Sequence, residues 1–348
     1  MKYMVITTRG FEDIIEQELN AKLSDLQIIE KSYRKIIFSY EGSINNILEI
    51  RSVEDAFLFI AKLDSIGHTR SDLPDLIKKI SGLDFSIAKE SLQKIRTEPI
   101  SQFSISSSSV GKRNYSYIEV KDGVSKILAP KLDLIYENEL HQEFDIRVFL
   151  EHESAYIGVR LGNTPLHRRP YKASTTKATL RADIAYCMAL LAEISHKDTV
   201  LDPMCGSGTI LIESSIFEPK MLIGGDIDPD ALEATKANVN SYDTSLDIQL
   251  KLWDSTSLPL PDRSVNKIIC NLPFGKQIEI EDLDKFYQQV LQEFIRILST
   301  NGKIVILTSH TNTANIVKSF KELSVIQTVE TNLNGEVTQL FVLENKKP

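Results

Sequence analysis

Strand-like and helix-like segments alternate from Thr199 onward, and this alternation constrains the fold more than any other feature. Apolar runs such as "TVLD", "MLIGGD" and "VNKIICN" are separated by amphipathic runs such as "DPDALEATKANVN" and "DKFYQQVLQEFIRIL". Strands that alternate with helices form right-handed βαβ units and a doubly wound sheet. The tail "SVIQTVETNLNGEVTQLFVLE" has two alternating strands around Asn334-Gly335, which is typical of an antiparallel hairpin. The sequence therefore predicts an α/β domain over residues 176–348 that ends in a hairpin.

The first 165 residues alternate helix and strand without a glycine-rich turn, so we expect small α+β units there. Between Leu161 and Thr176, the run "LGNTPLHRRPYKASTT" contains a glycine, two prolines and four basic residues, and it cannot form a continuous helix. We therefore place a linker at residues 161–175.

Composition limits the classes of protein that the chain could belong to. No apolar run approaches the roughly 20 residues that span a bilayer, and the N-terminus becomes charged too soon for a signal peptide, so we expect a cytoplasmic protein. The cysteines, at 187, 205 and 270, form no C-x-x-C pair and the six histidines lack metal-ligand spacing, which predicts neither disulfides nor a metal site. With a net charge of -8, any nucleic-acid surface has to be local.

The run "VLDPMCGSGTILIE" is typical of a ligand-binding turn between a strand and a helix. Asp202 ends the strand, and Gly206-Ser207-Gly208 precede the helix. Glycines allow a ligand to approach the backbone closely, and a helix N-terminus offers free N–H groups. The third glycine of the dinucleotide fingerprint is replaced by Leu211, which argues against NAD.

Two further carboxylates follow the next two strands. Asp226 lies 18 residues after Gly208, where it could accept the ribose hydroxyls of a nucleoside cofactor, and Asp254 follows the third strand, where it could bind an adenine amino group. A single aspartate could simply cap the helix that follows it. Three at successive strand ends, beside a glycine turn, favour a cofactor crevice. Asp228 fits a helix cap better, because it precedes Pro229 in the first turn of a helix.

A fourth strand ends in Asn271-Leu272-Pro273-Phe274-Gly275. Taken in order, D-P-M-C-G-S-G-T, G-G-D-I-D, W-D and N-L-P-F-G resemble the motifs of S-adenosylmethionine-dependent amino-methyltransferases, over most of residues 176–310. The resemblance implies a Rossmann-like domain that binds S-adenosyl-L-methionine. The cofactor contacts it implies are Asp202 and residues 204–208 for the methionine part, Asp226 for the ribose and Asp254 for the adenine. In full, the implied contacts are Asp202, Met204, Cys205, Gly206, Ser207, Gly208, Thr209, Asp226, Ile227, Asp254 and Ser255.

The same resemblance assigns catalytic roles to the fourth motif. Exocyclic base amines are weak nucleophiles, because their lone pair is delocalised into the ring. By resemblance, the Asn271 side-chain oxygen and the carbonyl of Leu272 or Pro273 accept the amine protons, and Phe274 stacks on the base, which is worth about 1–3 kcal/mol. The chain departs from the common D/N-P-P-Y at Leu272 and Phe274, although both the carbonyl and the ring are kept. A plain turn with one exposed aromatic is the alternative interpretation.

The N-terminal half resembles a THUMP domain of RNA-modifying enzymes in "FSISSSSVGKRNYSYIEVKDGVSKIL" and "FDIRVFLEHESAYIGVRLGNTPLHRRPYK". With the methyltransferase motifs, this indicates a THUMP-containing tRNA (guanine-N2) methyltransferase. The resemblance implies a ferredoxin-like unit at residues 1–60, a THUMP-like unit at 61–160 and tRNA as partner. Candidate phosphate contacts are Lys112, Arg113, Arg168, Arg169, Tyr171 and Lys172, unless they are merely a solvated loop and linker.

The predicted reaction is methyl transfer to the exocyclic N2 amine of a guanosine in tRNA, and the resemblance suggests the acceptor stem. Ribosomal RNA guanine-N2 methylation stays open, because related enzymes share these motifs. A DNA adenine or cytosine amino-methyltransferase is a further alternative, but no target-recognition insertion lies near Asn271. A pseudo-enzyme that only binds RNA is disfavoured by the intact Asp226, Asp254, Asn271 and Phe274.

Overall fold

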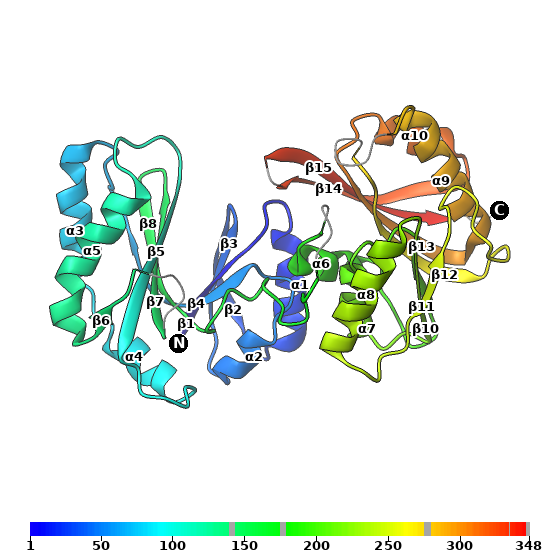
Figure 1. The fold of residues 1–348 in the computed structure, drawn as a ribbon. Helices are drawn as coiled ribbons and strands as arrows, with labels where there is room; N and C mark the ends of the chain where they lie inside the picture. The colour runs from blue at the N-terminus through cyan, green and yellow to red at the C-terminus, as the bar shows by residue number, and fades with distance from the viewer. Residues whose placement is uncertain (139–142, 175–178, 275–279, 334, 346–348) are drawn as a thin grey trace. The chain divides into compact units, whose positions relative to one another are not determined.

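The computed structural model describes residues 1–138, 143–174, 179–274, 280–333 and 335–345 (Figure 1). The chain divides into two compact units. The N-terminal unit comprises residues 1–7 and 16–166, and the C-terminal unit comprises residues 8–15 and 167–348. The change from one unit to the other at residues 166–167 falls inside the linker predicted at 161–175.

The N-terminal part of the chain is an α+β structure built on one eight-stranded sheet, with the order β2-β3-β1-β4-β8-β7-β5-β6. Its elements are β1 (Lys2–Ile6), α1 (Glu12–Lys22), β2 (Gln27–Ser32), β3 (Lys35–Ser39), α2 (Ile44–Leu48), β4 (Asp55–Leu63), a 3-10 turn (Arg70–Asp72), α3 (Leu73–Ser81), α4 (Ser86–Gln93), β5 (Gln102–Val110), α5 (Tyr117–Leu132), β6 (Ile135–Tyr136), β7 (Phe144–Glu151) and β8 (Ser154–Arg160).

The boundary expected between residues 60 and 61 is not a structural boundary. It falls inside β4, and β4 pairs with β1 on one side and β8 on the other, so one sheet continues across it. The two runs that resemble a THUMP domain form β5, α5 and the antiparallel pair β7–β8. The division of this unit into ferredoxin-like and THUMP-like parts stays a prediction.

The sheet of the N-terminal unit curls strongly. Strands β3 and β7 are four positions apart, which would separate them by about 19 Å in a flat sheet. The fully buried Lys35 on β3 nevertheless forms an ion pair with Glu151 on β7, and its Nζ lies 4.1 Å from the centre of the Tyr156 ring on β8. The curved sheet therefore encloses a buried region on its concave face.

The C-terminal unit has a seven-stranded sheet with the order β11-β10-β9-β12-β13-β15-β14. The strands from β11 to β13 are parallel, and β15 and β14 are antiparallel, so the predicted doubly wound sheet with a closing hairpin is confirmed. The elements are α6 (Ala182–Leu191), β9 (Thr199–Asp202), α7 (Thr209–Ser215), β10 (Met221–Asp226), α8 (Pro229–Tyr242), β11 (Gln249–Leu252), β12 (Val265–Asn271), α9 (Leu283–Ile297), β13 (Leu298–Thr308), α10 (Thr313–Ser319), β14 (Leu323–Leu333) and β15 (Glu336–Asn345).

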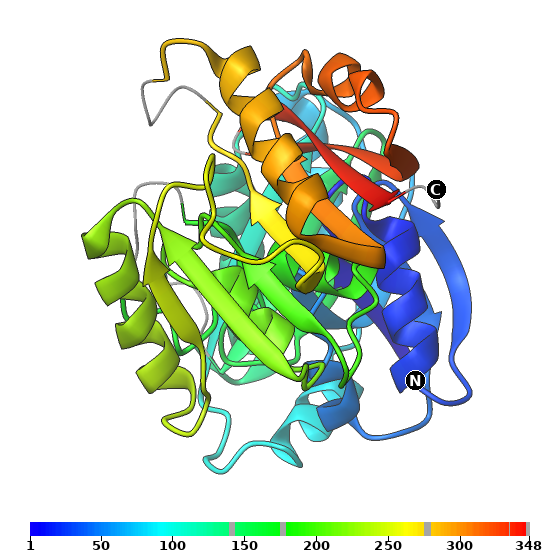
Figure 2. The same cartoon turned by 90° about the vertical axis from the view of Figure 1, so that its right-hand side faces the viewer.

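Helices cover both faces of this sheet. On β10, Ile223 packs into the core that contains α9 and α10, whereas the next residue, Gly224, faces Leu211 of α7. Successive residues of a strand point to opposite faces, so α7 and α9 lie on opposite sides (Figure 2). Strand order reverses between β9 and β12, and a crevice for ligands forms at such a point, at the carboxyl ends of the strands.

Within the described part of the chain, no helix is long and apolar enough to cross a membrane. No group of three or more histidine, cysteine, aspartate or glutamate side chains among the described residues is arranged to bind a metal. The three cysteines are free and buried.

Candidate active site

The predicted polar residues meet at one edge of the C-terminal sheet. They lie at the carboxyl ends of four neighbouring strands, in the spatial order β11, β10, β9 and β12. In that order the residues are Asp254, Asp226, Asp202 and Asn271. The register brings them together, because Asp202 pairs with Gly224 and Asp226 pairs with Leu252.

The glycine turn before α7 depends on two backbone conformations that glycine favours. Gly206 and Gly208 have φ angles of 54° and 78°, in the left-handed region. A Cβ atom at Gly208 would also lie 2.7 Å from the methyl group of Thr235. Both the conformation and the space therefore require glycine at position 208.

Two side chains of α8 hold the carbonyl groups of this turn. The Thr235 hydroxyl donates to the Gly206 carbonyl at 2.8 Å, and the Asn238 amide donates to the Ser207 carbonyl at 2.9 Å. Both residues are fully buried. Neither residue was among the predicted site residues, although two polar residues three apart on the buried face of an amphipathic helix are a signal in the sequence.

Asp226 connects the glycine turn with the end of β10. Its carboxylate accepts hydrogen bonds from the backbone N–H groups of Gly206, at 2.9 Å, and Asp228, at 3.0 Å. The side chain is half-buried, and Ile227 beside it is 71% exposed, which is unusual for an isoleucine. Asp228 is the N-cap of α8 and accepts from the backbone N–H of Asp230, so its predicted role as a cap is confirmed.

Asp202 is a buried carboxyl group, with 1% of its surface exposed. Burial raises the pKa of this carboxyl group to about 8. The Met204 backbone N–H, which donates to it at 3.2 Å, lowers the pKa, and the nearby negative charge of Asp226 raises it further. The carboxyl group therefore holds a proton at neutral pH in the ligand-free protein. A cationic ligand placed beside it would favour ionisation, because an opposite charge stabilises the carboxylate.

The third carboxylate, Asp254, is exposed and belongs to a local turn. It accepts hydrogen bonds from the backbone N–H of Thr256, at 2.8 Å, and from its hydroxyl, at 2.7 Å. Its neighbour Ser255 is buried. Trp253, which precedes it, is also buried, and its indole N–H donates to the Pro203 carbonyl at 3.1 Å. The only tryptophan of the chain therefore lies beneath the crevice, a role that its position in the sequence did not reveal.

The indole also explains a glycine on the neighbouring strand. A Cβ atom at Gly225 would lie 1.8 Å from Nε1 of Trp253, so no other residue fits there without moving the ring.

The Asn271 side chain carries a buried acceptor that lacks a partner. Its Oδ1 atom has no hydrogen-bond partner among the described residues. A buried acceptor without a donor costs about 1–3 kcal/mol, and such groups in native proteins need an explanation. Leu272 behind it is buried, whereas Pro273 and Phe274 are half-buried. The last residue of the predicted motif, Gly275, lies outside the described residues.

The other predicted cofactor residues lie in or beside the same turn. Burial raises the pKa of the Cys205 thiol well above its usual value, so the thiol is unreactive. The Ser207 hydroxyl lies 3.4 Å from that of Thr179, and Thr209 begins α7. Thr179 precedes α6 and was not predicted to contribute to this region.

Arg169 and Tyr171 do not form part of an exposed basic surface. Glu213 of α7 is fully buried, and its Oε1 atom accepts from Nε of Arg169 at 3.2 Å and from the hydroxyl of Tyr171 at 2.7 Å. A buried carboxylate has to be paired, and these two side chains pair it. Their contact with RNA stays a prediction, and their pairing with Glu213 does not favour it.

The remaining basic residues differ in exposure. The Arg113 guanidinium donates to the carbonyl groups of Gly67, at 3.0 Å, and His152, so it anchors its own loop. Lys172 is half-buried, and burial lowers its pKa to about 8, although Glu213 counteracts the shift. Lys112 and Arg168 are exposed. Of the six predicted residues, these two are the exposed ones, and their contact with phosphate stays a prediction.

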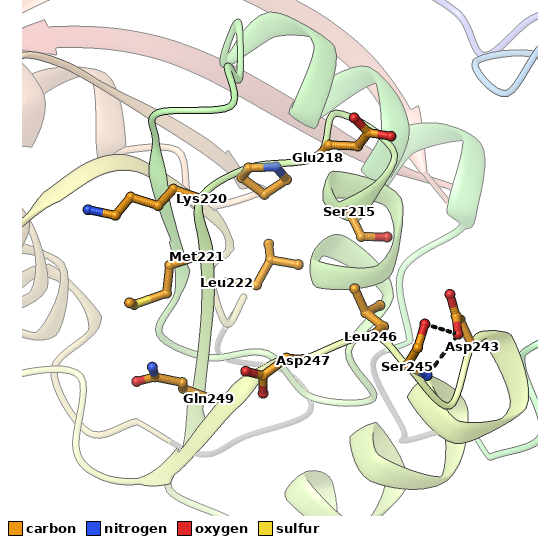
Figure 3. A pocket seen from close by; sticks show the side chains of 11 residues that line it. Ser215, Glu218, Lys220, Met221, Leu222, Asp243, Ser245, Leu246, Asp247 and Gln249 are labelled. Atoms are coloured by element: carbon orange, nitrogen blue, oxygen red, sulfur yellow. Dashed lines mark hydrogen bonds between the residues drawn. The ribbon is translucent and has the colours of Figure 1, made fainter.

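A hollow of about 380 Å³ lies elsewhere on the C-terminal unit (Figure 3). Its walls come from the segment that enters β10, including Lys220 and Met221, and from the segment that enters β11, including Asp247 and Gln249. These are the amino ends of the strands. The hollow is therefore separate from the edge that carries Asp202, Asp226 and Asn271.

The part of the chain that carries this edge matches a known protein family. Residues 169–339, which contain all four motifs, match the UPF0020 family, described as the RMKL-like methyltransferase domain. Residues 169–339 are thus similar to a methyltransferase domain of this family.

Two relatives and one solved structure extend the comparison. The chain is 37% identical over 168 residues to the mouse U6 snRNA (guanine-N(2))-methyltransferase THUMPD2, an alignment that covers 47% of this chain and 31% of the mouse protein. It is 23% identical over 344 residues to the tRNA (guanine(6)-N2)-methyltransferase of Archaeoglobus fulgidus, with coverage of 89% and 83%. The crystal structure of TrmN from Thermus thermophilus aligns over 99% of both chains, with a TM-score of 0.79 and 23% identity.

These similarities differ in what they show. This chain spans about a third of the length of the mammalian THUMPD2 proteins. The likeness to TrmN shows the fold over the whole chain. The predicted Rossmann-like fold is therefore confirmed.

Proposed function

We propose that the protein is an S-adenosyl-L-methionine-dependent RNA methyltransferase that modifies the exocyclic N2 amine of a guanosine in the acceptor stem of tRNA. One observation carries the proposal: the buried Oδ1 of Asn271, without a partner among the described residues, lies on the same edge as Asp202 and Asp226. The names of the mouse and archaeal relatives, both guanine-N2 methyltransferases of RNA, support the choice of target atom.

The residues at the edge fit the proposed cofactor. The edge from β11 to β12 covers three inter-strand spacings, about 14 Å, enough for a nucleoside at one end and a reacting group at the other. Asp226 would accept the ribose hydroxyls, exposed Ile227 would contact the adenine, and Asp202 would face the methionine ammonium. When bound, S-adenosylmethionine supplies a methyl group on a sulfonium, which an amine nitrogen can attack.

The side chains after β12 would prepare the base amine. Asn271 Oδ1 accepts a hydrogen bond from one N–H of the amine and a backbone carbonyl of the turn accepts one from the other N–H, which draws the nitrogen lone pair out of the ring system. Phe274, half-buried beside them, offers a ring face for stacking. A guanine paired in a stem has to flip out of the helix to reach this turn. Exposed Lys112 and Arg168 are our proposed phosphate contacts.

The reaction is tested by incubating the protein with methyl-labelled cofactor and separate pools of unmodified tRNA, ribosomal RNA and duplex DNA. We expect label in tRNA, recovered as N2-methylguanosine when the digest is separated by mass spectrometry. Label in ribosomal RNA alone, or recovery of methyladenosine or methylcytosine, would overturn the assignment.

Asn271→Ala tests the residue that carries the proposal. Turnover should fall about 100-fold or more, the loss typical of one preorganised polar contact to a transition state, while cofactor and RNA binding persist. Asn266→Ala is the matched control on the same strand. Asn266 accepts from the Thr199 backbone at 2.8 Å and donates to Ser299 at 3.1 Å, so its loss should lower the melting temperature without slowing turnover. Full turnover in Asn271→Ala would contradict the proposal.

A further inference from the structure

A buried tyrosine on α9 contacts the turn that follows Asn271. Tyr287 is fully buried, and its hydroxyl lies 3.1 Å from the Pro273 carbonyl and 2.6 Å from the Thr308 hydroxyl, at the end of β13. Neither Tyr287 nor Thr308 belongs to the four motifs. Their contacts nevertheless connect two further elements of the methyltransferase domain with the turn.

The direction of these hydrogen bonds follows from the chemistry of the groups. A carbonyl can only accept, so the Tyr287 proton points to Pro273, and the Tyr287 oxygen accepts from the Thr308 hydroxyl. The Thr308 oxygen in turn accepts from the His310 backbone N–H at 2.9 Å. Burial raises the pKa of Tyr287 well above its usual value, so its hydroxyl stays a donor across the physiological range.

The tyrosine ring is also held in place from the other side. The His310 ring packs edge-on against it, with centroids 5.0 Å apart, and His310 Nε2 lies 2.6 Å from a carboxylate oxygen of Asp284. The other oxygen of Asp284 accepts from Asn312 at 2.7 Å. These contacts hold the Tyr287 hydroxyl in place, so that its hydrogen bond can hold the Pro273 carbonyl.

The turn needs such a partner because strand pairing ends there. The Leu272 backbone N–H donates to the Leu307 carbonyl at 3.0 Å, and Pro273 has no N–H to continue the ladder. With the Pro273 carbonyl bound to Tyr287, the Leu272 carbonyl is the one that no described residue contacts through a hydrogen bond. This choice between the two carbonyls could not be made from the sequence.

We propose that Tyr287, supported by Thr308, is a positioning residue for methyl transfer: it fixes Pro273 so that the Leu272 carbonyl and Asn271 Oδ1 together face the acceptor amine. This inference rests on the proposed function for its chemistry. Misplacing a reacting group by about 1 Å can cost about 100-fold in rate, so loss of this anchor should affect turnover rather than binding.

The test compares variants that differ by one hydroxyl group. Tyr287→Phe should lower kcat about 10- to 100-fold, with the KM for RNA and the Kd for the cofactor within twofold of wild type. Thr308→Val should do the same, and Thr308→Ser, which keeps the hydroxyl, should restore turnover. Tyr186→Phe is the control, because it alters a buried tyrosine of α6 that stacks on Phe217. Wild-type kcat in Tyr287→Phe, or equal impairment of both Thr308 variants, would overturn the proposal.

Two readouts separate this proposal from the proposed function. Turnover is counted as total label transferred to RNA, so a product other than N2-methylguanosine refutes the proposed function and still reports on Tyr287. Hydrogen exchange of the Leu272 amide in cofactor-free protein needs no activity at all. Exchange there should be at least tenfold faster in Tyr287→Phe than in wild type, and unchanged exchange would show that Tyr287 does not fix the turn.

Discussion

The buried carboxyl group of Asp202 should make the stability of the cofactor-free protein depend on pH. Its pKa is about 8 in the folded protein, against an ordinary value of 3.8. Between these values the folded state holds one proton more than the unfolded state, so the free energy of unfolding falls as the pH rises. Below pH 3.8 both states are protonated and above about pH 8 both are ionised, so the slope is confined to that window.

Asp202→Asn removes this proton and keeps the shape, including an oxygen that can accept from the Met204 N–H. One proton corresponds to about 1.4 kcal/mol per pH unit, so from pH 5 to pH 7 the variant should gain about 2.7 kcal/mol relative to wild type. For a domain of this size that is a relative rise in melting temperature of about 5–10 °C. Cofactor affinity should fall at the same time, because the amide cannot pair with an ammonium group.

The assay is thermal unfolding of both proteins without cofactor at pH 5, 6 and 7, followed by calorimetric titration with cofactor. Asp228→Asn is the control, because Asp228 is an exposed cap and not a buried acid. If the melting curves of wild type and Asp202→Asn shift in parallel with pH, then Asp202 does not hold a proton, and the electrostatic argument for the crevice fails.

Two further predictions concern RNA and the base. The double variant Lys112→Ala/Arg168→Ala should bind tRNA more weakly, and the slope of its log affinity against log[salt] should be flatter by about 2. Arg169→Ala should instead mainly lower the melting temperature. An unchanged salt slope in the double variant would place the RNA surface elsewhere. Phe274→Ala should lose about 1–3 kcal/mol of base capture, seen as a higher KM for tRNA, and Phe274→Tyr should be tolerated; equal KM values for Ala and wild type would exclude stacking.

The C-terminal fold was predictable because its signals are local. Each strand is a short apolar run and each helix is amphipathic, and short connections of this kind leave few possible topologies. The N-terminal boundary was not predictable for the opposite reason. β4 looks like the end of one unit, but its pairing with β8, about 100 residues later, decides that the sheet continues. Pairing over that distance depends on the whole sheet and leaves no mark in a window of sequence.

The sequence was enough to place a residue of the candidate site that lies at the end of its own strand. It was not enough to find a residue that holds another part of the site in place. Asp202 and Asp226 follow strands that can be recognised directly. Thr235 and Tyr287 matter only because α8 and α9 place them against particular carbonyl groups. Arg169 shows the same limit, since its charge suggested an exposed surface until Glu213 of α7 was found to bind it.

This chain has Leu272 where the common form of the fourth motif has a proline. The contacts of Leu272 and Tyr287 give this difference a physical explanation. A proline there would restrict the backbone but could not donate to the Leu307 carbonyl, as the Leu272 N–H does at 3.0 Å. The Leu272 side chain, 1% exposed, packs in the core cluster that also contains Tyr287 and Phe294. The chain thus replaces a covalent restraint by a strand hydrogen bond, worth about 1 kcal/mol, and by buried apolar surface. With Tyr287 bound to the Pro273 carbonyl, the turn is held by hydrogen bonds at the peptide groups on either side of the Leu272–Pro273 peptide.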